Sequence, residues 1–286
     1  MEIVLKDVSV TYMQGTPFAK KALERINVHI PTASITGLIG HTGSGKSTLV
    51  LVIAGLILPT NGTIQVGSFQ WSNKKRNLFQ LRKHIGVVFQ YPEHQLFAET
   101  VEKDISFGLK NLGIDNEQLK LRVKEAMESV KLPYDIFKDI SPFKLSGGQM
   151  KRVALAGVLA QKPDIIILDE PTAGLDATGK QDVLSLLEEL REQGKTIIIV
   201  SHSMDEIAGL SDRLIVLNQG KIEMEGTPEA IFSQEKRLAE INLDLPDITK
   251  LIVLLNKELK PAIPLKCFKI DELEEQIIQR LKGKKQ

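Results

Sequence analysis

The fold of this chain is decided by the stretch ITGLIGHTGSGKST, residues 35–48. Residues 35–39 form a short, largely apolar run of the kind found in buried parallel strands. Residues 40–48 follow as a glycine-rich turn that leads into a helix beginning near Lys46. In such a turn the backbone N–H groups can point inward around an anion, and the helix N-terminus adds partial positive charge. The stretch therefore predicts an α/β fold with a phosphate site at the end of a strand.

The turn is expected to be a phosphate-binding loop, because it has the required glycines, lysine and hydroxyl residues in the required order. Lys46 is expected to reach the β- and γ-phosphates, the Ser47 hydroxyl to ligate Mg²⁺, and Thr48 to contact the α-phosphate. A turn that only capped a helix would not require a lysine followed by two hydroxyls. We therefore predict a P-loop NTPase core whose phosphate loop consists of Gly40, His41, Thr42, Gly43, Ser44, Gly45, Lys46, Ser47 and Thr48.

Further strands are predicted by four runs of similar character. They are short, β-branched and almost unbroken in apolar character, which suits a parallel sheet buried on both faces. The first thirty residues differ, because short β segments at 2–10 and 25–30 flank a turn-rich stretch at 14–17. We expect a mainly parallel sheet with an antiparallel β subdomain beside it. The four runs cover residues 85–89, 165–168, 196–200 and 214–217.

Helical pattern dominates two other parts of the chain. Apolar residues recur with helical spacing from Leu119 to Val130, which predicts a helical subdomain at about 91–162. After Gly226 the sequence again becomes helical and charged, with several prolines. The expected organisation is one ATPase domain over residues 1–230, followed by a small C-terminal appendage over residues 231–286.

The composition excludes several classes of protein. The chain has 286 residues, of which 42% are hydrophobic, so it can bury a sizeable core. Its net charge of +1 gives no general attraction to nucleic acid. The single cysteine, Cys267, and the absence of a leader-like start suggest a reducing cytoplasm. The longest apolar stretch, 49–58, is about half of what a bilayer crossing needs. Other chains would have to supply any membrane crossing.

A second chemical signal is the pair of acids that ends the apolar run 165–168. Carboxylates at the carboxyl edge of an open α/β sheet lie where ligands collect. Asp169 fits a group that holds Mg²⁺ through its water shell, because magnesium accepts few protein ligands. Glu170 fits a general base that positions the attacking water. An isolated Asp-Glu pair is more often a solvated turn, and it is the phosphate loop that favours the catalytic interpretation.

The third signal is the segment LSGGQ, residues 145–149, followed by an apolar helix. It resembles the signature segment of ABC ATPases. The resemblance implies ATP as the nucleotide, with Ser146 and the amide of Gly148 donating to the γ-phosphate bound by an opposite subunit. A plain helix cap would use the same residues. The phosphate loop and the acidic strand end, which occur in the family's order, favour the signature.

Other positions match the family's motifs in order. By this resemblance Gln90 reaches Mg²⁺ and the attacking water, and His202 is the switch histidine that bonds the γ-phosphate. Asp176 lies at the subunit contact, although it can equally cap the helix that follows. Tyr12 is placed where the family stacks an aromatic ring on adenine. Phe18 is close enough in sequence to compete for that role, and the sequence leaves the choice open.

The branch of the family is indicated by two stretches and by the appendage. The stretches GTPF at 15–18 and QYPEHQLF at 90–97 resemble the second ATPase subunit of energy-coupling factor transporters. That resemblance implies vitamin or transition-metal uptake, and work at the cytoplasmic face of the cell membrane. It also implies three partners: a paralogous ATPase subunit paired head to tail, a transmembrane scaffold, and a membrane-embedded substrate-binding subunit. The appendage would then add contact between subunits.

One alternative function comes from another class of ABC ATPase. A soluble, non-transport member acts as a nucleotide-gated clamp on nucleic acid. Such proteins usually carry two cassettes or long coiled coils, whereas this sequence has one phosphate loop, one signature and no sustained heptad run. The near-neutral charge balance also disfavours a clamp on a phosphate backbone.

Overall fold

The computed structural model describes residues 1–73, 78–258 and 260–283. A six-stranded sheet has the order β10-β9-β3-β8-β7-β6, and its neighbouring strands are parallel except for the β9–β10 pair. A four-stranded antiparallel sheet has the order β2-β1-β4-β5. The strands are β1 (Ile3–Tyr12), β2 (Lys20–Ile30), β3 (Ile35–Ile39), β4 (Asn61–Val66), β5 (Phe69–Trp71), β6 (Ile85–Val88), β7 (Ile165–Asp169), β8 (Thr196–Val200), β9 (Arg213–Asn218) and β10 (Lys221–Gly226).

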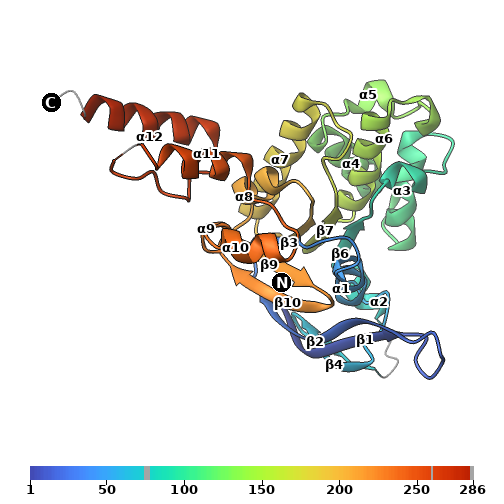
Figure 1. The fold of residues 1–286 in the computed structure, drawn as a ribbon. Coiled ribbons are helices and arrows are strands. Elements are labelled where there is room, and N and C mark those ends of the chain that lie inside the picture. The colour runs from blue at the N-terminus through green and yellow to red at the C-terminus, as the bar shows by residue number, and fades with distance from the viewer. Residues whose placement is uncertain (74–77, 259, 284–286) are drawn as a thin grey trace.

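Helices surround the six-stranded sheet on both faces (Figure 1). Several of them begin at a side-chain cap of the expected type, as α3 does at Thr100 and α4 does at Asp115. The helices are α1 (Lys46–Ile53), α2 (Phe79–Arg82), η1 (Pro92–Gln95), α3 (Val101–Asn111), α4 (Asn116–Ser129), α5 (Tyr134–Phe137), η2 (Pro142–Lys144), α6 (Gly147–Leu159), α7 (Ala177–Glu192), α8 (Met204–Leu210), α9 (Pro228–Phe232), α10 (Glu235–Glu240), α11 (Asp247–Leu255) and α12 (Ile270–Gly283).

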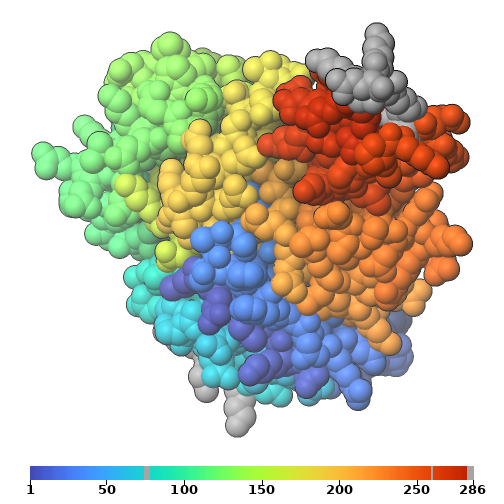
Figure 2. Space-filling model, turned by 90° about the vertical axis from the view of Figure 1, so that its left-hand side faces the viewer, coloured from blue at the N-terminus to red at the C-terminus, as the bar shows by residue number. Residues whose placement is uncertain are grey.

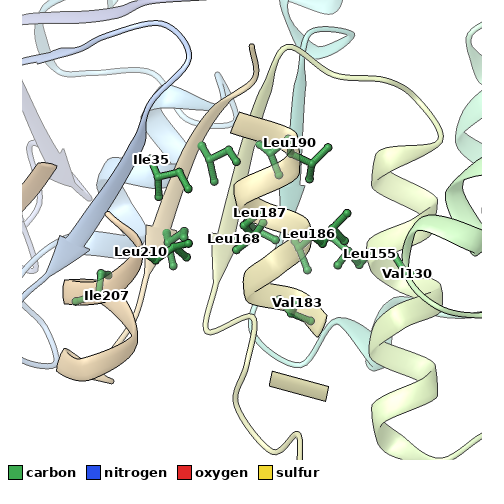
Figure 3. Packing of buried hydrophobic residues seen from close by; sticks show 14 of the residues in the cluster. Ile35, Val130, Leu155, Leu168, Val183, Leu186, Leu187, Leu190, Ile207 and Leu210 are labelled. Carbon is green, nitrogen blue, oxygen red and sulfur yellow. The ribbon is translucent and has the colours of Figure 1, made fainter. Parts of the chain in front are cut away.

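The central strands alternate their side chains between two apolar clusters. On β7, Ile165 and Ile167 face a cluster shared with α1 and the antiparallel sheet, whereas Ile166 and Leu168 face a cluster shared with the helices on the other side. Figure 3 shows the second cluster, in which Leu168 lies beside Leu187 of α7. All four β7 side chains are fully buried. Burial of each of these side chains contributes roughly 2–3 kcal/mol to the free energy of unfolding, relative to an exposed side chain. The six-stranded sheet is therefore a main source of the stability of the fold.

The expected fold class is confirmed, and the antiparallel sheet is larger than predicted. β2 begins at Lys20 rather than at residue 25, and β4 and β5 were not expected. The first half of β2 is polar, so its sequence carries no strand signal. This half of β2 becomes a strand because it pairs with β1. The pairing contains register shifts, at which Asp7 and Arg25 adopt positive φ.

The C-terminal region divides into two packing units. Residues from Ile231 to Leu245 belong to the large cluster on the helical side of the sheet. A separate small cluster begins at Ile248 and joins α11 to α12. Figure 1 shows these two helices projecting from the body next to α7 and α8, and Figure 2 shows them apart from the helices of residues 101–159. Phe268 packs against both clusters, so it links α11 and α12 to the body of the molecule.

Gly37 of β3 has no room for a side chain. A Cβ there would lie 2.5 Å from Ile207 Cγ1 and 2.6 Å from Leu214 Cδ2. We predict that Gly37→Ala lowers the free energy of unfolding by about 1–3 kcal/mol through overpacking. The control is Gly157→Ala in α6, where the nearest atom, Ile105 Cα, is 3.9 Å away, and that change should be neutral or stabilising. Denaturant unfolding of both variants measures the difference, and equal stabilities would contradict the prediction.

Candidate nucleotide site

The sheet topology brings the predicted site residues to one edge. Because β3, β8, β7 and β6 are parallel neighbours in that order, their carboxyl ends lie side by side. The phosphate loop follows β3, His202 follows β8, Asp169 ends β7 and Gln90 follows β6. Four segments that are far apart in the chain therefore meet where open α/β sheets bind ligands.

The phosphate loop has a backbone that requires glycine. Gly40 has a φ of +152°, and a Cβ on it would lie 2.3 Å from the carbonyl oxygen of Leu217. Gly45 has a φ of +112° and immediately precedes α1. α1 begins with no side-chain cap and no acidic residue in its first turn, so its N–H groups are left for an anion. Within the described residues the buried Ser44 hydroxyl also has no hydrogen-bond partner. These features fit the phosphates of a nucleotide.

Lys46 lies within the curve of its own loop. Its Nζ donates to the carbonyl oxygens of Gly40 and His41 at 2.7 and 3.1 Å, and the residue is only 7% exposed. Burial lowers the pKa of this ammonium group, while the charges of Asp169 and Glu170 act in the opposite direction. The ammonium group is thus held by the carbonyl oxygens of its own loop and is influenced by the charges of both carboxylates.

Three residues around the loop have contacts that the sequence did not predict. His41 lies with Nδ1 2.8 Å from the Thr42 carbonyl oxygen and Nε2 3.1 Å from Asn218 Oδ1. The hydroxyls of Tyr12 and Thr48 share a hydrogen bond of 3.2 Å. Tyr12 is therefore next to the phosphate loop. Phe18 is 78% exposed.

Glu170 is held between the ends of β7 and β8. Its backbone N–H donates to the Val200 carbonyl at 2.9 Å, and its Oε1 accepts from the His202 backbone N–H at 2.7 Å. The His202 ring nitrogen Nε2 is 3.9 Å from the same oxygen. Glu170 has a φ of +53°, an unfavourable conformation for a residue with a side chain. These contacts fix the carboxylate in spite of the strain.

The two carboxyl groups differ from exposed acids in their pKa. Burial raises the pKa of Asp169, and the charges of Lys46 and His202 offset this only in part. Burial likewise raises the pKa of Glu170, again against the His202 charge and hydrogen bond. A carboxylate with a raised pKa is a stronger base, which suits the predicted role of Glu170.

Metal binding by the protein alone is not indicated. Across the described ranges no group of three or more His, Cys, Asp or Glu side chains could hold an ion. The Ser47 hydroxyl is exposed in the first turn of α1, and Asp169 supplies a hard oxygen from β7. Such sparse oxygen donors fit Mg²⁺, which keeps its waters and shares its coordination with phosphates.

The signature segment faces a different hollow. Ser146 caps α6 in a capping box, in which its Oγ accepts from the Gln149 N–H at 3.3 Å and its N–H donates to Gln149 Oε1 at 2.9 Å. It borders an open hollow of about 410 Å³ together with Gly148 and Asp176, and the lining contains no phosphate-loop residue. Ser146 and Gly148 therefore border a hollow that this chain's own phosphate loop does not line.

Asp176 caps the helix that follows it. Its carboxylate caps α7 by accepting from the Gly179 N–H at 2.8 Å. Gln90 is exposed after β6. One polar residue near the site was missed: Glu206 in α8 accepts from the buried hydroxyl of Thr172. In the sequence it looks like an ordinary acid in the first turn of a helix, so no signal pointed to it.

Known proteins are similar to this chain over its whole length. The family model of the ABC transporter matches residues 23–173. The energy-coupling factor transporter ATP-binding protein EcfA2 of Caldanaerobacter subterraneus subsp. tengcongensis is 49% identical, covering 100% of this chain and 99% of that protein. The protein of the same name from Clostridioides difficile is 46% identical, covering 99% of each.

Two solved structures extend the comparison. The structure of cbiO1 from Clostridium perfringens, part of the ABC transporter complex cbiONQ, has a TM-score of 0.73 and 34% identity, covering 88% of this chain and 98% of that one. The ATP-binding cassette MJ0796, a dimer bound to ADP and Pi in a post-hydrolysis state, has a TM-score of 0.71 and 31% identity, covering 79% and 98%.

The raised pKa of Glu170 has a consequence for stability. Because burial raises the pKa of Glu170 in the folded protein, its ionised form lowers the free energy of unfolding at a pH above this raised pKa. This penalty disappears as the pH falls toward 4.5, the ordinary pKa of a glutamate. We predict that Glu170→Gln raises the Tm of the nucleotide-free protein at pH 7.5 by a few degrees, and by less near pH 4.5, with roughly 2–4 °C for each kcal/mol.

The matched control is Glu24→Gln. Glu24 lies at the surface with its side chain 34% exposed, and its hydrogen bond with Lys21 lowers its pKa, so this change should leave Tm unaltered or slightly lower it at pH 7.5. Thermal unfolding of the three proteins at both pH values is the measurement. A Glu170→Gln protein less stable than wild type at pH 7.5 would rule out the burial penalty.

Proposed function

The chain belongs to the ABC transporter family, and from that membership we propose that it is the ATP-hydrolysing subunit of an energy-coupling factor importer. The proposal is carried by one observation above all. The phosphate loop, His202 and the acidic pair stand at the adjacent carboxyl ends of β3, β8 and β7, in a chain that matches energy-coupling factor ATP-binding proteins from end to end. That end-to-end match disfavours a soluble clamp on nucleic acid.

ATP binding is assigned to the phosphate loop. The Lys46 ammonium donates to the carbonyl oxygens of Gly40 and His41. With ATP it would turn to the β- and γ-phosphates, while Ser44 and the free N–H groups of α1 donate to phosphate oxygens. Mg²⁺, held by Ser47, Asp169 and Gln90, would neutralise charge on those phosphates. Tyr12 is assigned to the adenine ring, because its bond to Thr48 places it against the loop, with Phe18 as the alternative.

Hydrolysis is assigned to Glu170 and His202. Glu170 acts as the general base that orients a water for in-line attack on the γ-phosphate, and the two β8-end contacts keep its carboxylate in place. His202 is 57% exposed at its side chain, so its imidazole is free to turn toward the γ-phosphate. Gln90 would contact the same water and report the state of the site to a partner.

Completion of the site is assigned to a second ATPase subunit, a paralogue paired head to tail. Ser146 and Gly148 would bind the γ-phosphate on that subunit, and Asp176 would lie at the contact. The separate hollow that these residues border supports this arrangement. So does the similarity to a dimeric cassette structure with ADP and Pi.

The remaining partners are a transmembrane scaffold and a membrane-embedded substrate-binding subunit, met at the cytoplasmic face of the cell membrane. No helix in residues 1–73, 78–258 and 260–283 is both long and apolar enough to span a bilayer. Exposed aromatic residues follow Gln90, with Phe97 packed edge to face on Phe107, and would contact the scaffold. We assign residues 1–230 to the ATPase domain and residues 231–286 to an appendage that packs on this domain between Ile231 and Leu245 and adds subunit contact.

Removal of the general base should stop hydrolysis without removing ATP binding. We predict that Glu170→Gln lowers kcat about 10²–10⁴-fold while ATP still binds. Lys46→Ala should lose nucleotide binding or turnover. Glu225→Gln on β10, where the carboxylate pairs with Arg213 at 2.7 Å, is the control expected to keep wild-type turnover. Phosphate release and ATP-binding calorimetry distinguish these outcomes, and near-normal turnover of Glu170→Gln would exclude its role.

The partner assignment is tested by isolating the chain from its native membrane with a mild detergent. The tag belongs at the C-terminus, because the Met1 carbonyl accepts from the buried Thr196 hydroxyl at 2.8 Å and an N-terminal extension would disturb that contact. We expect a second ABC ATPase and integral membrane proteins to co-purify, with more of the ATPase retained when Glu170→Gln is loaded with ATP. Recovery of the chain alone, or with nucleic acid, would contradict the transporter assignment.

A further inference from the structure

Thr172 and Glu206 form a buried contact between two functional segments. Thr172 follows the acidic pair by two residues and is 3% exposed. Its hydroxyl donates to Oε2 of Glu206, whose side chain is 17% exposed. Buried hydroxyls and carboxylates are costly without partners, so this bond constrains both residues.

Glu206 also contacts the helix that follows this segment. Its second oxygen, Oε1, accepts from the Lys180 ammonium at 3.0 Å, and Lys180 lies in the first turns of α7. The Lys180 backbone N–H in turn donates to the Asp176 carbonyl at 2.9 Å. The segment 171–176 leads from β7 to α7, and a single carboxylate therefore binds its start, at Thr172, and the helix into which it leads, at Lys180.

The same helix that carries Glu206 begins just after His202. The His202 backbone N–H bonds to Glu170 Oε1 at 2.7 Å. Residues 170 and 172 are thus joined to residues 202 and 206 by two hydrogen bonds that act in parallel. Side chains of α7 and α8, among them Leu187 and Ile207, line one small cavity beside these bonds. The general base, the segment 171–176 and the switch histidine consequently form one closed ring of contacts.

The electrostatics of the ring favour a fixed geometry. Glu206, Asp169 and Glu170 are acids on neighbouring elements, and the charge of Glu206 adds to the effect of burial in raising the Glu170 pKa. His202, which follows β8, acts against this rise, and Lys180 of α7 pairs with Glu206. Glu170 and Glu206 are tolerated on neighbouring elements because each carboxylate has its own donors.

We propose that Glu206 is a positioning residue that ties the segment 171–176 to the switch helix, so that the subunit contact at Asp176 sets the position of His202 and Glu170. This inference rests on the proposed roles of those three residues. Movement of Asp176 on dimer closure is transmitted through Thr172 and Lys180 to α8. The contact between subunits thereby becomes a condition for hydrolysis within each one.

The test removes the bond without changing the shape of its partners. Thr172→Val deletes the hydroxyl, and Thr172→Ser retains it. Glu206→Met deletes the acceptor at similar length. In the complex purified through this chain, we expect Thr172→Val and Glu206→Met each to lower kcat about tenfold, with KM for ATP changed less than about twofold, as for loss of one hydrogen bond to a charged group. Thr172→Ser should restore most of the turnover.

The double variant separates positioning from general stability. The double variant Thr172→Val/Glu206→Met contains neither the donor nor the acceptor of this bond, so its Tm should be higher than that of the single variants. Its kcat should stay as low as the kcat of each single variant. Glu223→Gln, which breaks an exposed pair with Arg237, is the control with unchanged turnover.

Three outcomes overturn the inference. They are wild-type kcat in both single variants, no rescue by Thr172→Ser, and recovery of kcat together with Tm in the double variant. Glu170→Gln is measured in parallel. If it hydrolyses ATP normally, the proposed function fails; if it is inactive while the Thr172 and Glu206 variants behave as wild type, only this inference fails.

Discussion

The parallel pairing of β3, β8 and β7 is the constraint on which the rest of the structure depends. These strands are buried on both faces, and their common direction places three loops at a single edge. A slip of one residue between β7 and β8 would displace their ends by about 3.3 Å. A displacement of that size would break the 2.7 Å hydrogen bond between the His202 N–H and the Glu170 carboxylate. The register of the sheet therefore also sets the relative positions of the proposed catalytic groups.

The carboxyl edge of the sheet is energetically costly for the protein by itself. Lys46, Asp169 and Glu170 are removed from water, and each has its pKa moved toward the neutral form by burial. Glu170 in addition occupies a left-handed backbone conformation. The large apolar clusters on the two faces of the sheet stabilise the fold enough to carry this strain. A bound nucleotide with its metal would give these charges the partners that the protein alone supplies only in part.

The arrangement also explains why one chain presents two unlike surfaces. Ser146 and Asp176 are used locally as caps of α6 and α7, and both nevertheless border a hollow that the phosphate loop does not reach. A capping side chain has its orientation fixed by the helix that it caps, so it can meet an external ligand with little further ordering. The contacts of Thr172 and Glu206 join that surface to the hydrolytic edge within the same chain.

The sequence by itself determined what depends on neighbours in the chain. The nine residues of the phosphate loop, the cap at Asp176 and the apolar strand before Asp169 act over a few residues, so their patterns can be recognised in a single sequence. Only the tertiary structure decided which strands are adjacent, that the polar half of β2 pairs with β1, and that Thr172 meets Glu206. Those contacts join residues far apart in the chain, and a side chain's type does not specify its distant partner; the partner is set by how the sheet and its helices pack.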